Sequence, residues 1–250
     1  MDPKGKVALV TGGASRVGGA ITLGLARAGA DVVIHYRSSS GPAEKVASEA
    51  RRLGVDAIAV QAGLGDQQGA ERLGEAVEAS VGGIDILVHA ASPFIETPLE
   101  TLTPPAWRLV MGVVVESFLW LTQRLALQMK QRGQGTIITI LDLGAFQPWP
   151  RYLAHGVGKS ALWALTRSLA VELAPEVRVN SVVPGPVLPP PDYTEAQIAE
   201  GGQNTLLARW GDPQDVVEAV LFLVQCDYVT GEALFVDGGE RWAHRRSRAS

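Results

Sequence analysis

The sequence predicts a single doubly wound α/β domain, with a seven-stranded parallel sheet flanked by helices. Short apolar runs, typical of strands buried on both faces, alternate with helix-like segments along the whole chain. The chain has 250 residues, of which 46% are hydrophobic and 19% charged, so it can bury one large core. Since no linker or repeat divides it, we expect one domain over residues 1–240 and a basic tail over residues 241–250.

Each expected strand is an apolar run that is too short for a buried helix. The seven runs are Lys6–Val10, Asp31–Tyr36, Ala57–Gln61, Asp85–His89, Thr136–Leu141, Val177–Val183 and Ala233–Val236. Helices are predicted to begin after Thr103 and Asp212, because each is a capping residue followed by a proline that suits the first turn. Asp66 is expected to cap a third helix. Strands and helices in this alternation form a parallel sheet that is covered on both faces.

Composition and charge exclude several classes of protein. The net charge of -4 argues against a general nucleic-acid binder. No apolar run reaches the roughly 20 residues that span a bilayer, and the N-terminus leads into the first strand without a signal-peptide core. The lone Cys226 rules out an intrachain disulfide and a cysteine-based zinc site, and the histidines show no metal-ligand spacing. We therefore expect a cytoplasmic protein with a small-molecule substrate and no membrane, nucleic-acid or metal partner.

A glycine-rich turn follows the first expected strand and opens a helix. It reads "TGGASRVG" over Thr11–Gly18. Small residues let the backbone approach a diphosphate, and the helix N-terminus supplies free N–H groups and the positive end of a dipole. A glycine turn that binds nothing is the alternative, but its position after the first strand of a doubly wound pattern favours a dinucleotide cofactor.

The end of the second strand indicates which dinucleotide is bound. NAD-specific sites place an acidic residue there, which holds the ribose hydroxyls and repels a 2′-phosphate. This chain has "HYRSSS" at His35–Ser40, without an acid. Arg37 can pair with a phosphate, Ser38 and Ser39 can donate hydrogen bonds, and Arg16 adds a second positive charge. The pattern favours NADP(H), the alternative being an exposed loop that is basic without binding a phosphate.

Over nearly its whole length the chain resembles the short-chain dehydrogenase/reductases, a family with a Rossmann-type fold. The resemblance rests on the glycine turn, on "HAAS" after the fourth strand and on Lys159, which lies four residues after His155. It rests also on Pro184-Gly185 after the sixth strand and on "TGEALFVDGG" at Thr230–Gly239.

Within that family the chain is most similar to pteridine reductases and their bacterial relatives. These proteins have arginine at the position of Arg16 and an "HY…RS" sequence at the end of the second strand. They carry aspartate at the position of Asp142, where most relatives carry serine, and a segment similar to "ASPFIETPL" at Ala91–Leu99. The resemblance implies reduction of a pterin-like compound with NADPH.

The resemblance also implies which residues hold the ligands. Phe94 occupies the position where a pterin ring stacks against the nicotinamide, although ordinary core packing explains a single aromatic residue as well. Tyr152 is implied to lie beside the substrate pocket, and Asp142 to contact the substrate. The implied contacts to NADPH or NADP+ are Gly12, Ser15, Arg16, Val17, Gly18, His35, Tyr36, Arg37, Ser38, Leu64, Ala90, Ser92, Lys159, Pro184 and Gly185.

The expected catalytic residues are Asp142, His155 and Lys159. In the family a tyrosine donates the proton, a lysine four residues later binds the nicotinamide ribose, and an asparagine joins the lysine to a water chain. Here His155 stands at the tyrosine position, Lys159 is the lysine, and Val114 stands at the asparagine position. Asp142 follows the fifth strand, on the edge of the sheet where open α/β folds bind ligands.

Histidine can act as a general acid, since its reference pKa near 6.5 is close to neutrality. Lys159 opposes a positive charge on the imidazole of His155 whereas ionised Asp142 favours it, so the sequence leaves the balance open. The imidazole is also shorter than a tyrosine, while a proton donor needs contact at about 2.6–3.2 Å or one bridging water. Tyr152, three residues earlier, is an alternative donor, although packing at the rim of the pocket is its simpler role.

Three hypotheses follow from these residues. The first is an NADPH-dependent reductase of a pterin-like C=N compound, because Asp142 and a water can deliver a proton to a ring nitrogen. The second is a related reductase of a carbonyl compound. The third is a cofactor-binding protein with little or no catalysis, a sensor or partner-binding module, which the replaced tyrosine and asparagine favour. The family usually forms homotetramers through the helices that carry Leu121–Gln123 and Lys159, and we expect the same here.

Overall fold

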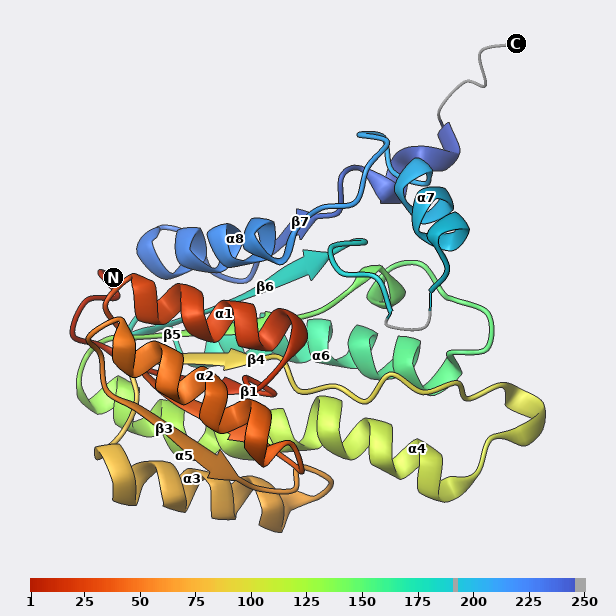
Figure 1. The fold of residues 1–250 in the computed structure, drawn as a ribbon. Coiled ribbons are helices and arrows are strands. Elements are labelled where there is room, and N and C mark those ends of the chain that lie inside the picture. Colours follow the sequence, from red (N-terminus) through yellow and green to blue (C-terminus); the bar gives the residue numbers. More distant parts are fainter. Residues whose placement is uncertain (191–192, 246–250) are drawn as a thin grey trace.

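Seven parallel strands form the central sheet of the protein, and helices cover both of its faces (Figure 1). The computed structural model describes residues 1–190 and 193–245. The strand order is β3-β2-β1-β4-β5-β6-β7 and every neighbouring pair is parallel, which confirms the predicted fold class. The strands are β1 (Val7–Thr11), β2 (Asp31–Tyr36), β3 (Ala57–Gln61), β4 (Ile86–His89), β5 (Gly135–Ile140), β6 (Val177–Pro184) and β7 (Ala233–Val236).

The predicted strands match the observed ones to within one residue at each end. Continuous apolar runs form these strands because both faces of the sheet are buried. The register places Leu9 beside Val33 and Leu87, and Leu87 beside Ile137, so these side chains form a row on one face. Residues between them, such as Val10, belong to the core of the opposite face.

The helices divide between the two faces (Figure 1). Helices α1, α2 and α8 cover one face, and α3, α4, α5 and α6 cover the other. The expected caps are confirmed, since Asp66, Thr103 and Asp212 each accept a hydrogen bond from a backbone N–H of the first turn. The helices are α1 (Arg16–Arg27), α2 (Ser40–Arg52), α3 (Gln67–Val81), α4 (Pro104–Met111), α5 (Ser117–Gln131), α6 (Leu153–Glu172), α7 (Glu195–Gln203) and α8 (Pro213–Gln225).

The strand order determines where a ligand can bind. β2 and β3 extend the sheet on one side of β1, whereas β4 to β7 extend it on the other side. The loops that leave β1 and β4 therefore run in opposite directions and open a crevice at the carboxyl ends of the strands. The glycine turn follows β1 and the "HAAS" segment begins at the end of β4, so both border this crevice.

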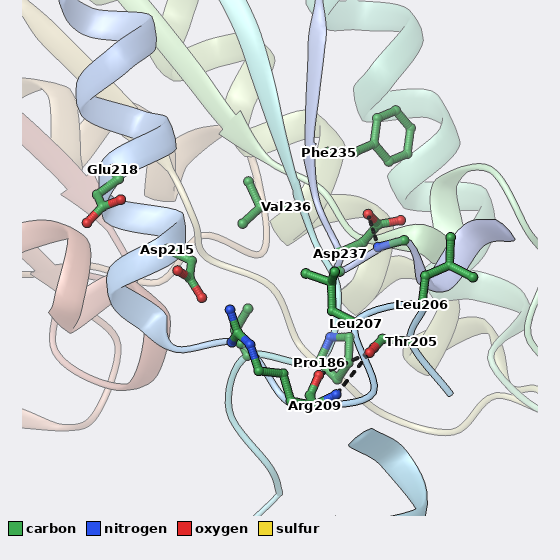
Figure 2. Close-up of a pocket in the computed structure, with 14 residues that line it drawn as sticks. Pro186, Thr205, Leu206, Leu207, Arg209, Asp215, Glu218, Phe235, Val236 and Asp237 are labelled. Carbon is green, nitrogen blue, oxygen red and sulfur yellow. Dashed lines mark hydrogen bonds between the residues drawn. The ribbon is translucent and has the colours of Figure 1, made fainter. Parts of the chain in front are cut away.

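A cavity of about 510 Å³ lies at the carboxyl ends of β6 and β7, beside the start of α8 (Figure 2). Its lining is largely apolar, with Arg209, Asp215, Glu218 and Asp237 as charged members. None of the predicted catalytic residues lines it.

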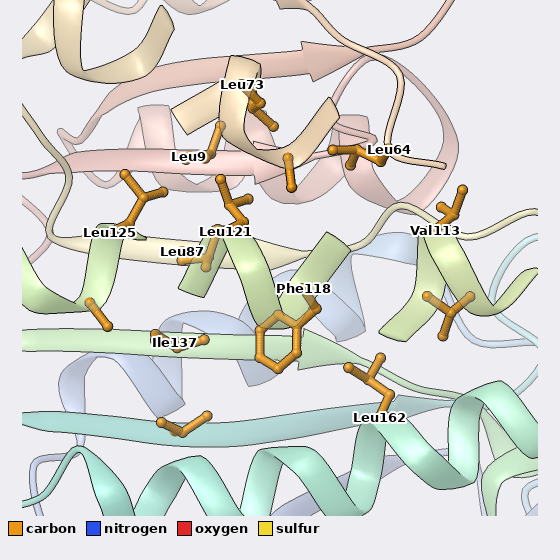
Figure 3. Packing of buried hydrophobic residues seen from close by; sticks show 14 of the residues in the cluster. Leu9, Leu64, Leu73, Leu87, Val113, Phe118, Leu121, Leu125, Ile137 and Leu162 are labelled. Carbon is orange, nitrogen blue, oxygen red and sulfur yellow. The ribbon is translucent and has the colours of Figure 1, made fainter. Parts of the chain in front are cut away.

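The core on the α5 and α6 face holds the helix that carries two of the predicted catalytic residues, His155 and Lys159 (Figure 3). Phe118 and Leu121 of α5 pack with Leu87 and Ile137 of the sheet, and all four are fully buried. Leu162 of α6 joins the same cluster. Burial of side chains of this size contributes roughly 1.5–3 kcal/mol each, so α6 is fixed firmly against the sheet.

One helical run is longer and more apolar than the sequence indicated. α4, a π-helical segment over Gly112–Glu116 and α5 are continuous, and by length and composition alone the run Pro104–Gln131 could cross a membrane. This corrects the expectation that no apolar stretch is long enough. In the fold 56% of its apolar window is buried inside the protein, as expected for a helix that lines a core.

The basic segment that the sequence predicts as a tail begins with ordered structure. Glu240–Arg245 form a short 3-10 helix after β7. The guanidinium of Arg241 lies 3.7 Å from the ring centroid of Phe235, and its Nε lies 3.9 Å from Oδ2 of Asp237. The start of the segment therefore packs on the domain, while residues 246–250 lie outside the described residues.

Candidate active site

The glycine turn after β1 closes into α1 as the sequence predicts. Gly12 has a φ of +67°, a left-handed conformation that glycine adopts readily. A Cβ on Gly18 would collide with the carbonyl oxygen of Gly12, and a Cβ on Gly12 would lie 3.1 Å from Cα of Ala91. Ser15, the N-cap residue, makes no side-chain cap hydrogen bond, so its hydroxyl leaves the first N–H groups of α1 available. This tight turn with free donors fits a diphosphate.

His35 holds the glycine turn in place through hydrogen bonds of its imidazole. Its Nδ1 accepts a hydrogen bond from the N–H of Gly12 at 3.0 Å, and its Nε2 lies 3.1 Å from the carbonyl oxygen of Ala62. Because Nδ1 accepts, the proton is on Nε2, which donates to Ala62. Burial lowers the pKa of His35 to about 4, and only 3% of the residue is exposed. Both ring nitrogens of His35 are thus bonded within the protein, and its predicted contact with the cofactor stays a prediction.

Thr11 and His89 join the same turn to the end of β4. The hydroxyl of Thr11 accepts hydrogen bonds from the N–H groups of Ala90 and Ala91 at 3.1 Å, so it donates its own proton to Nδ1 of His89 at 3.0 Å. Burial and then the nearby charge of Lys159 lower the pKa of His89 to about 3. Both buried histidines are therefore neutral at physiological pH. Their hydrogen bonds join the glycine turn to neighbouring segments of the chain.

Acidic pH is expected to destabilise the fold through His35 and His89. In the unfolded chain they titrate near 6.5, whereas the folded protein holds their pKa values at about 4 and about 3. Because the folded-state values are depressed, protonation favours unfolding, and stability falls as the pH drops below about 6.5, down to about 4 for His35 and about 3 for His89. We expect the free energy of unfolding to decrease by several kcal/mol over this range in urea titrations.

A His35→Asn variant should show a weaker pH dependence, because the amide oxygen can still accept from Gly12 without titrating. A His244→Gln variant removes an exposed histidine and should keep the full dependence. Equal pH dependence in all three proteins would show that buried histidines do not cause the acid sensitivity.

Two arginines beside the turn have no carboxylate partner among the residues that the structure describes. Arg16 is exposed, adopts a φ of +50° and donates from Nη2 to the carbonyl oxygen of Leu188 at 3.1 Å, across to the loop after β6. Arg37 is exposed at the end of β2, where its carbonyl oxygen accepts from Nε2 of Gln61 at 3.0 Å. Within residues 1–190 and 193–245 no carboxylate forms an ion pair with either guanidinium. Both are therefore free to meet phosphate groups.

The other predicted cofactor residues lie at the carboxyl ends of the strands. The side chain of Leu64 is buried in the core, so only the backbone of this residue is available to a ligand. Ser92 has a buried hydroxyl with no hydrogen-bond partner among the described residues. The positions that border the crevice by their place in the fold are Ser15, Val17, Tyr36, Ser38, Ala90, Pro184 and Gly185.

Asp142, His155 and Lys159 meet at the carboxyl end of β5. Nε2 of His155 lies 2.7 Å from Oδ2 of Asp142, and Nζ of Lys159 lies 3.9 Å from the same oxygen. Oδ1 of Asp142 accepts from the N–H of Gly144 at 2.9 Å, and Lys159 donates to the carbonyl oxygen of Ile140 at 2.7 Å. The structure thus brings together the three residues that the sequence predicts as catalytic.

Burial governs the charges in this cluster. Burial opposes ionisation of Asp142, but the hydrogen bond from His155 and the charge of Lys159 outweigh it and hold the pKa of Asp142 below its usual range. Burial lowers the pKa of Lys159, and the charge of Asp142 offsets this only in part. An ionised carboxylate therefore faces an imidazole and a poorly solvated ammonium group.

Aromatic rings enclose His155. Trp149 lies nearly parallel to the imidazole, at 9° with centroids 5.9 Å apart, and Phe94 meets it edge-on at 5.1 Å. Phe94 also stacks on Tyr152 at 4.6 Å, which places it at the site and leaves its contact with a ligand as a prediction. Only 2% of His155 is exposed, whereas 57% of Phe94 is exposed. A cavity of about 1110 Å³ borders Trp149 and Tyr152.

Val114 offers no polar group to this site. It is fully buried in the π-helical segment Gly112–Glu116, where its side chain joins the core. His89 faces the same segment, because its Nε2 lies toward the carbonyl groups of Val113 and Val114, although without a hydrogen bond of normal geometry. The ring of His89 also contacts Phe118, with centroids 5.1 Å apart.

Sequence reasoning missed two residues that shape the site. Thr11 lies in the glycine motif, but nothing in the motif indicates that its hydroxyl fixes the tautomer of His89. Trp149 precedes the catalytic helix by several residues, and no local pattern indicates that its ring lies on His155. Such contacts join segments from different elements, so the sequence carries no periodic signal for them.

Comparisons with known proteins give sequence matches over most of this chain. A family model described as "Enoyl-(Acyl carrier protein) reductase" matches residues 12–240. The human protein "Dehydrogenase/reductase SDR family member 4" is 33% identical over 243 residues, which cover 94% of this chain and 87% of that protein. Neither description names a pteridine reductase.

Solved structures are similar to nearly the whole chain. A gluconate 5-dehydrogenase from Burkholderia cenocepacia, in complex with NADP and tartrate, has a TM-score of 0.86 and 29% identity, covering 95% of this chain and 96% of that one. A blue fluorescent protein from a metagenomic library, in complex with NADPH, has a TM-score of 0.86 and 31% identity, covering 96% and 99%.

Proposed function

The chain belongs to the short-chain dehydrogenase/reductase family of oxidoreductases, and from this premise we propose that it reduces a small C=N or C=O compound with NADPH. The observation that carries the proposal is the meeting of Asp142, His155 and Lys159 at the carboxyl end of β5. A carboxylate, an imidazole and an ammonium group at one point are the parts needed to hold and move a proton. The crevice beside the glycine turn is the place for a dinucleotide.

NADPH is favoured over NADH by the charges around the crevice. The N-terminus of α1 would hold the diphosphate, and Arg37 with Ser38 would hold the 2′-phosphate. Arg16, which has no carboxylate partner in the described part of the chain, adds positive charge on the same side. No acidic residue stands at the end of β2 to repel that phosphate.

The chemistry divides between the cofactor and the residues of the cluster. The reduced nicotinamide supplies a hydride when it is bound. Lys159 would hold the ribose hydroxyls, because its buried ammonium group uses only part of its donor capacity on Ile140 and Asp142. His155, held by Asp142, would provide the proton for the substrate atom next to the reduced carbon.

A flat heteroaromatic substrate, such as a pterin, suits the aromatic side of the site. Phe94 is more than half exposed and is stacked on Tyr152, so it presents a ring face that a planar ligand can cover. The Asp142 carboxylate can accept from ring N–H groups. A ketone would use the same residues with a smaller contact to Phe94.

A substrate panel tests this proposal. Purified protein is incubated with NADPH and a set of oxidised pterins, cyclic imines and ketones, and loss of NADPH absorbance is followed. We expect turnover with at least one heteroaromatic C=N compound and weaker turnover with ketones. NADPH binding without oxidation by any compound would overturn the proposal.

A second candidate is a cofactor-binding protein with little catalysis, a sensor or partner-binding module. The observation that favours it is the near-complete burial of His155 beneath Phe94, Trp149 and Tyr152, together with the apolar Val114. Such a protein would bind NADPH tightly and leave it unchanged.

A His155→Tyr variant separates the two candidates. If histidine is the working acid, we expect kcat for the best substrate to fall about tenfold or more, because the phenol cannot keep the position of Nε2 against Asp142. NADPH affinity, measured by fluorescence titration, should stay unchanged. A His244→Tyr variant serves as the matched control. A large gain in kcat would instead favour a naturally weakened site and the second candidate.

The homotetramer and the cytoplasmic location expected from the sequence stay predictions. Exposed apolar residues on the outer sides of α5 and α6, Leu127, Val157 and Val171, support an oligomer through these helices.

A further inference from the structure

Only one nitrogen of His155 can take part in proton transfer. Nε2 is bonded to Oδ2 of Asp142 at 2.7 Å, and the other carboxylate oxygen is bonded to the N–H of Gly144. Nδ1 is buried and has no hydrogen-bond partner among the described residues. Buried polar atoms in native proteins are normally paired, so an unpaired one at a site of this kind indicates a missing ligand atom or water.

The surroundings fix the plane of the imidazole. Trp149 lies parallel to it and Phe94 lies perpendicular to it, at 9° and 89°. The hydrogen bond to Asp142 prevents the ring from turning over, and Trp149 limits its tilt.

We propose that Asp142 and His155 form a carboxylate–imidazole dyad that donates its proton from Nδ1, and that Trp149 is the positioning residue of this dyad. This deepens the proposed function and rests on it. The dyad occupies the position where the family has a tyrosine, but it transfers the proton from a different atom and holds it with a different partner.

Protons and electrons balance in the transfer of hydride and proton to the substrate. The substrate carbon gains the hydride that the nicotinamide supplies, and the neighbouring nitrogen or oxygen gains the proton from Nδ1. The electron pair of the Nδ1–H bond stays on His155, which becomes neutral imidazole with its remaining proton on Nε2, facing Asp142. A proton from solvent restores the imidazolium. No further oxidant or reductant is needed.

The charges around the dyad are few. Asp142 faces the imidazole of His155 from the turn after β5, and Lys159, on the same helix as His155, faces Asp142. Tyr152 contributes a phenol from the start of α6. The exposed pair of Glu96 and Arg151 is bonded to itself and lies at the surface. Asp142 is therefore the anion that holds the imidazolium, and Lys159 is the cation that opposes it.

Access to Nδ1 requires one ring of the enclosure to move. Phe94 is 57% exposed, whereas Trp149 is only partly exposed and packs against the core. Phe94 is thus the ring with room to rotate, and a planar substrate that stacks on it would reach Nδ1 in the same movement.

Nitrogen-15 NMR of histidine-labelled protein tests the assignment without turnover. The sample is the full chain with saturating NADP+, and His155 is identified by loss of its signals in His155→Gln. His35 and His89 stay neutral above pH about 5, because burial holds their pKa values at about 4 and about 3. We expect Nε2 of His155 to remain protonated at every pH while Nδ1 gains and loses the proton. Titration at Nε2, with Nδ1 constantly protonated, would overturn the proposal.

The pH profile of kcat tests the role of Trp149. In Trp149→Leu we expect kcat to fall about tenfold and the shape of its pH profile to change, with the dissociation constant of NADPH unchanged. Trp149→Phe should recover most of the lost kcat and most of the original pH profile. Trp163→Leu is the matched control, since its ring contacts Phe146 and Arg167 and lies outside the enclosure.

The outcomes separate the two proposals. An unchanged profile in Trp149→Leu would remove Trp149 from the dyad. If no substrate is turned over, the reductase function fails, while the NMR experiment still decides which nitrogen of His155 carries the mobile proton.

Discussion

Arg37→Asp is expected to lower the affinity for NADPH by about 100-fold and to make NADH the better ligand. A guanidinium bonded to a phosphate contributes about 1.5–3 kcal/mol, and every 1.4 kcal/mol corresponds to a factor of about ten. The new carboxylate adds repulsion against the 2′-phosphate and can accept from the two ribose hydroxyls of NADH. The change therefore acts on both cofactors in opposite directions.

Because of the position of Arg37, its effect on cofactor binding can be measured without an effect on folding. Its side chain is exposed and has no ion-pair partner among the described residues, so its removal breaks no contact that holds the fold. Affinity for both dinucleotides is measured by isothermal titration, with the melting temperature as a check on folding. Arg72→Asp, an equal change of charge on the exposed side of α3, should leave both affinities unchanged. Equal loss in the two variants would mean that net charge, and not a phosphate contact, attracts the cofactor.

Lys159→Met is expected to lower kcat by about 100-fold to 10,000-fold and to leave the fold intact. The ammonium group is the cation next to Asp142 and the proposed holder of the ribose, so its loss affects both positioning and the balance of charge in the cluster. Methionine is similar in length to the lysine chain. It therefore fills the same space on α6.

The stability of this variant should be unchanged or slightly higher. Burial lowers the pKa of Lys159, which means that the charged form costs free energy in the folded protein at neutral pH. Asp142 keeps its hydrogen bonds from His155 and Gly144, so the substitution does not leave that carboxylate unpaired. Steady-state kinetics and thermal denaturation measure the two effects. Lys45→Met, an exposed lysine of α2, is the control. Unimpaired turnover by the Lys159 variant would exclude its proposed role.

The site was predictable where it depends on motifs that lie within one turn or loop. The glycine turn, Arg37 and the spacing of four residues between His155 and Lys159 are local features, and the structure places them as expected. The meeting of Asp142 with His155 was predictable only through the resemblance, since thirteen residues and an irregular loop separate them. The support of the turn by His35 was not predicted, because the resemblance implied only a contact with the cofactor at that position.

The sequence by itself determined the order of strands and helices, the two-sided burial of the sheet and the edge where a dinucleotide would bind. These follow from apolar periodicity, helix caps and chain connectivity, which act over short distances along the chain. Only the tertiary structure decided that Nδ1 of His155 is the nitrogen without a partner among the described residues, that Trp149 and Phe94 enclose the ring, and that His35 and His89 stay neutral. Those properties depend on burial and on contacts between side chains from separate elements, and packing alone brings such side chains together.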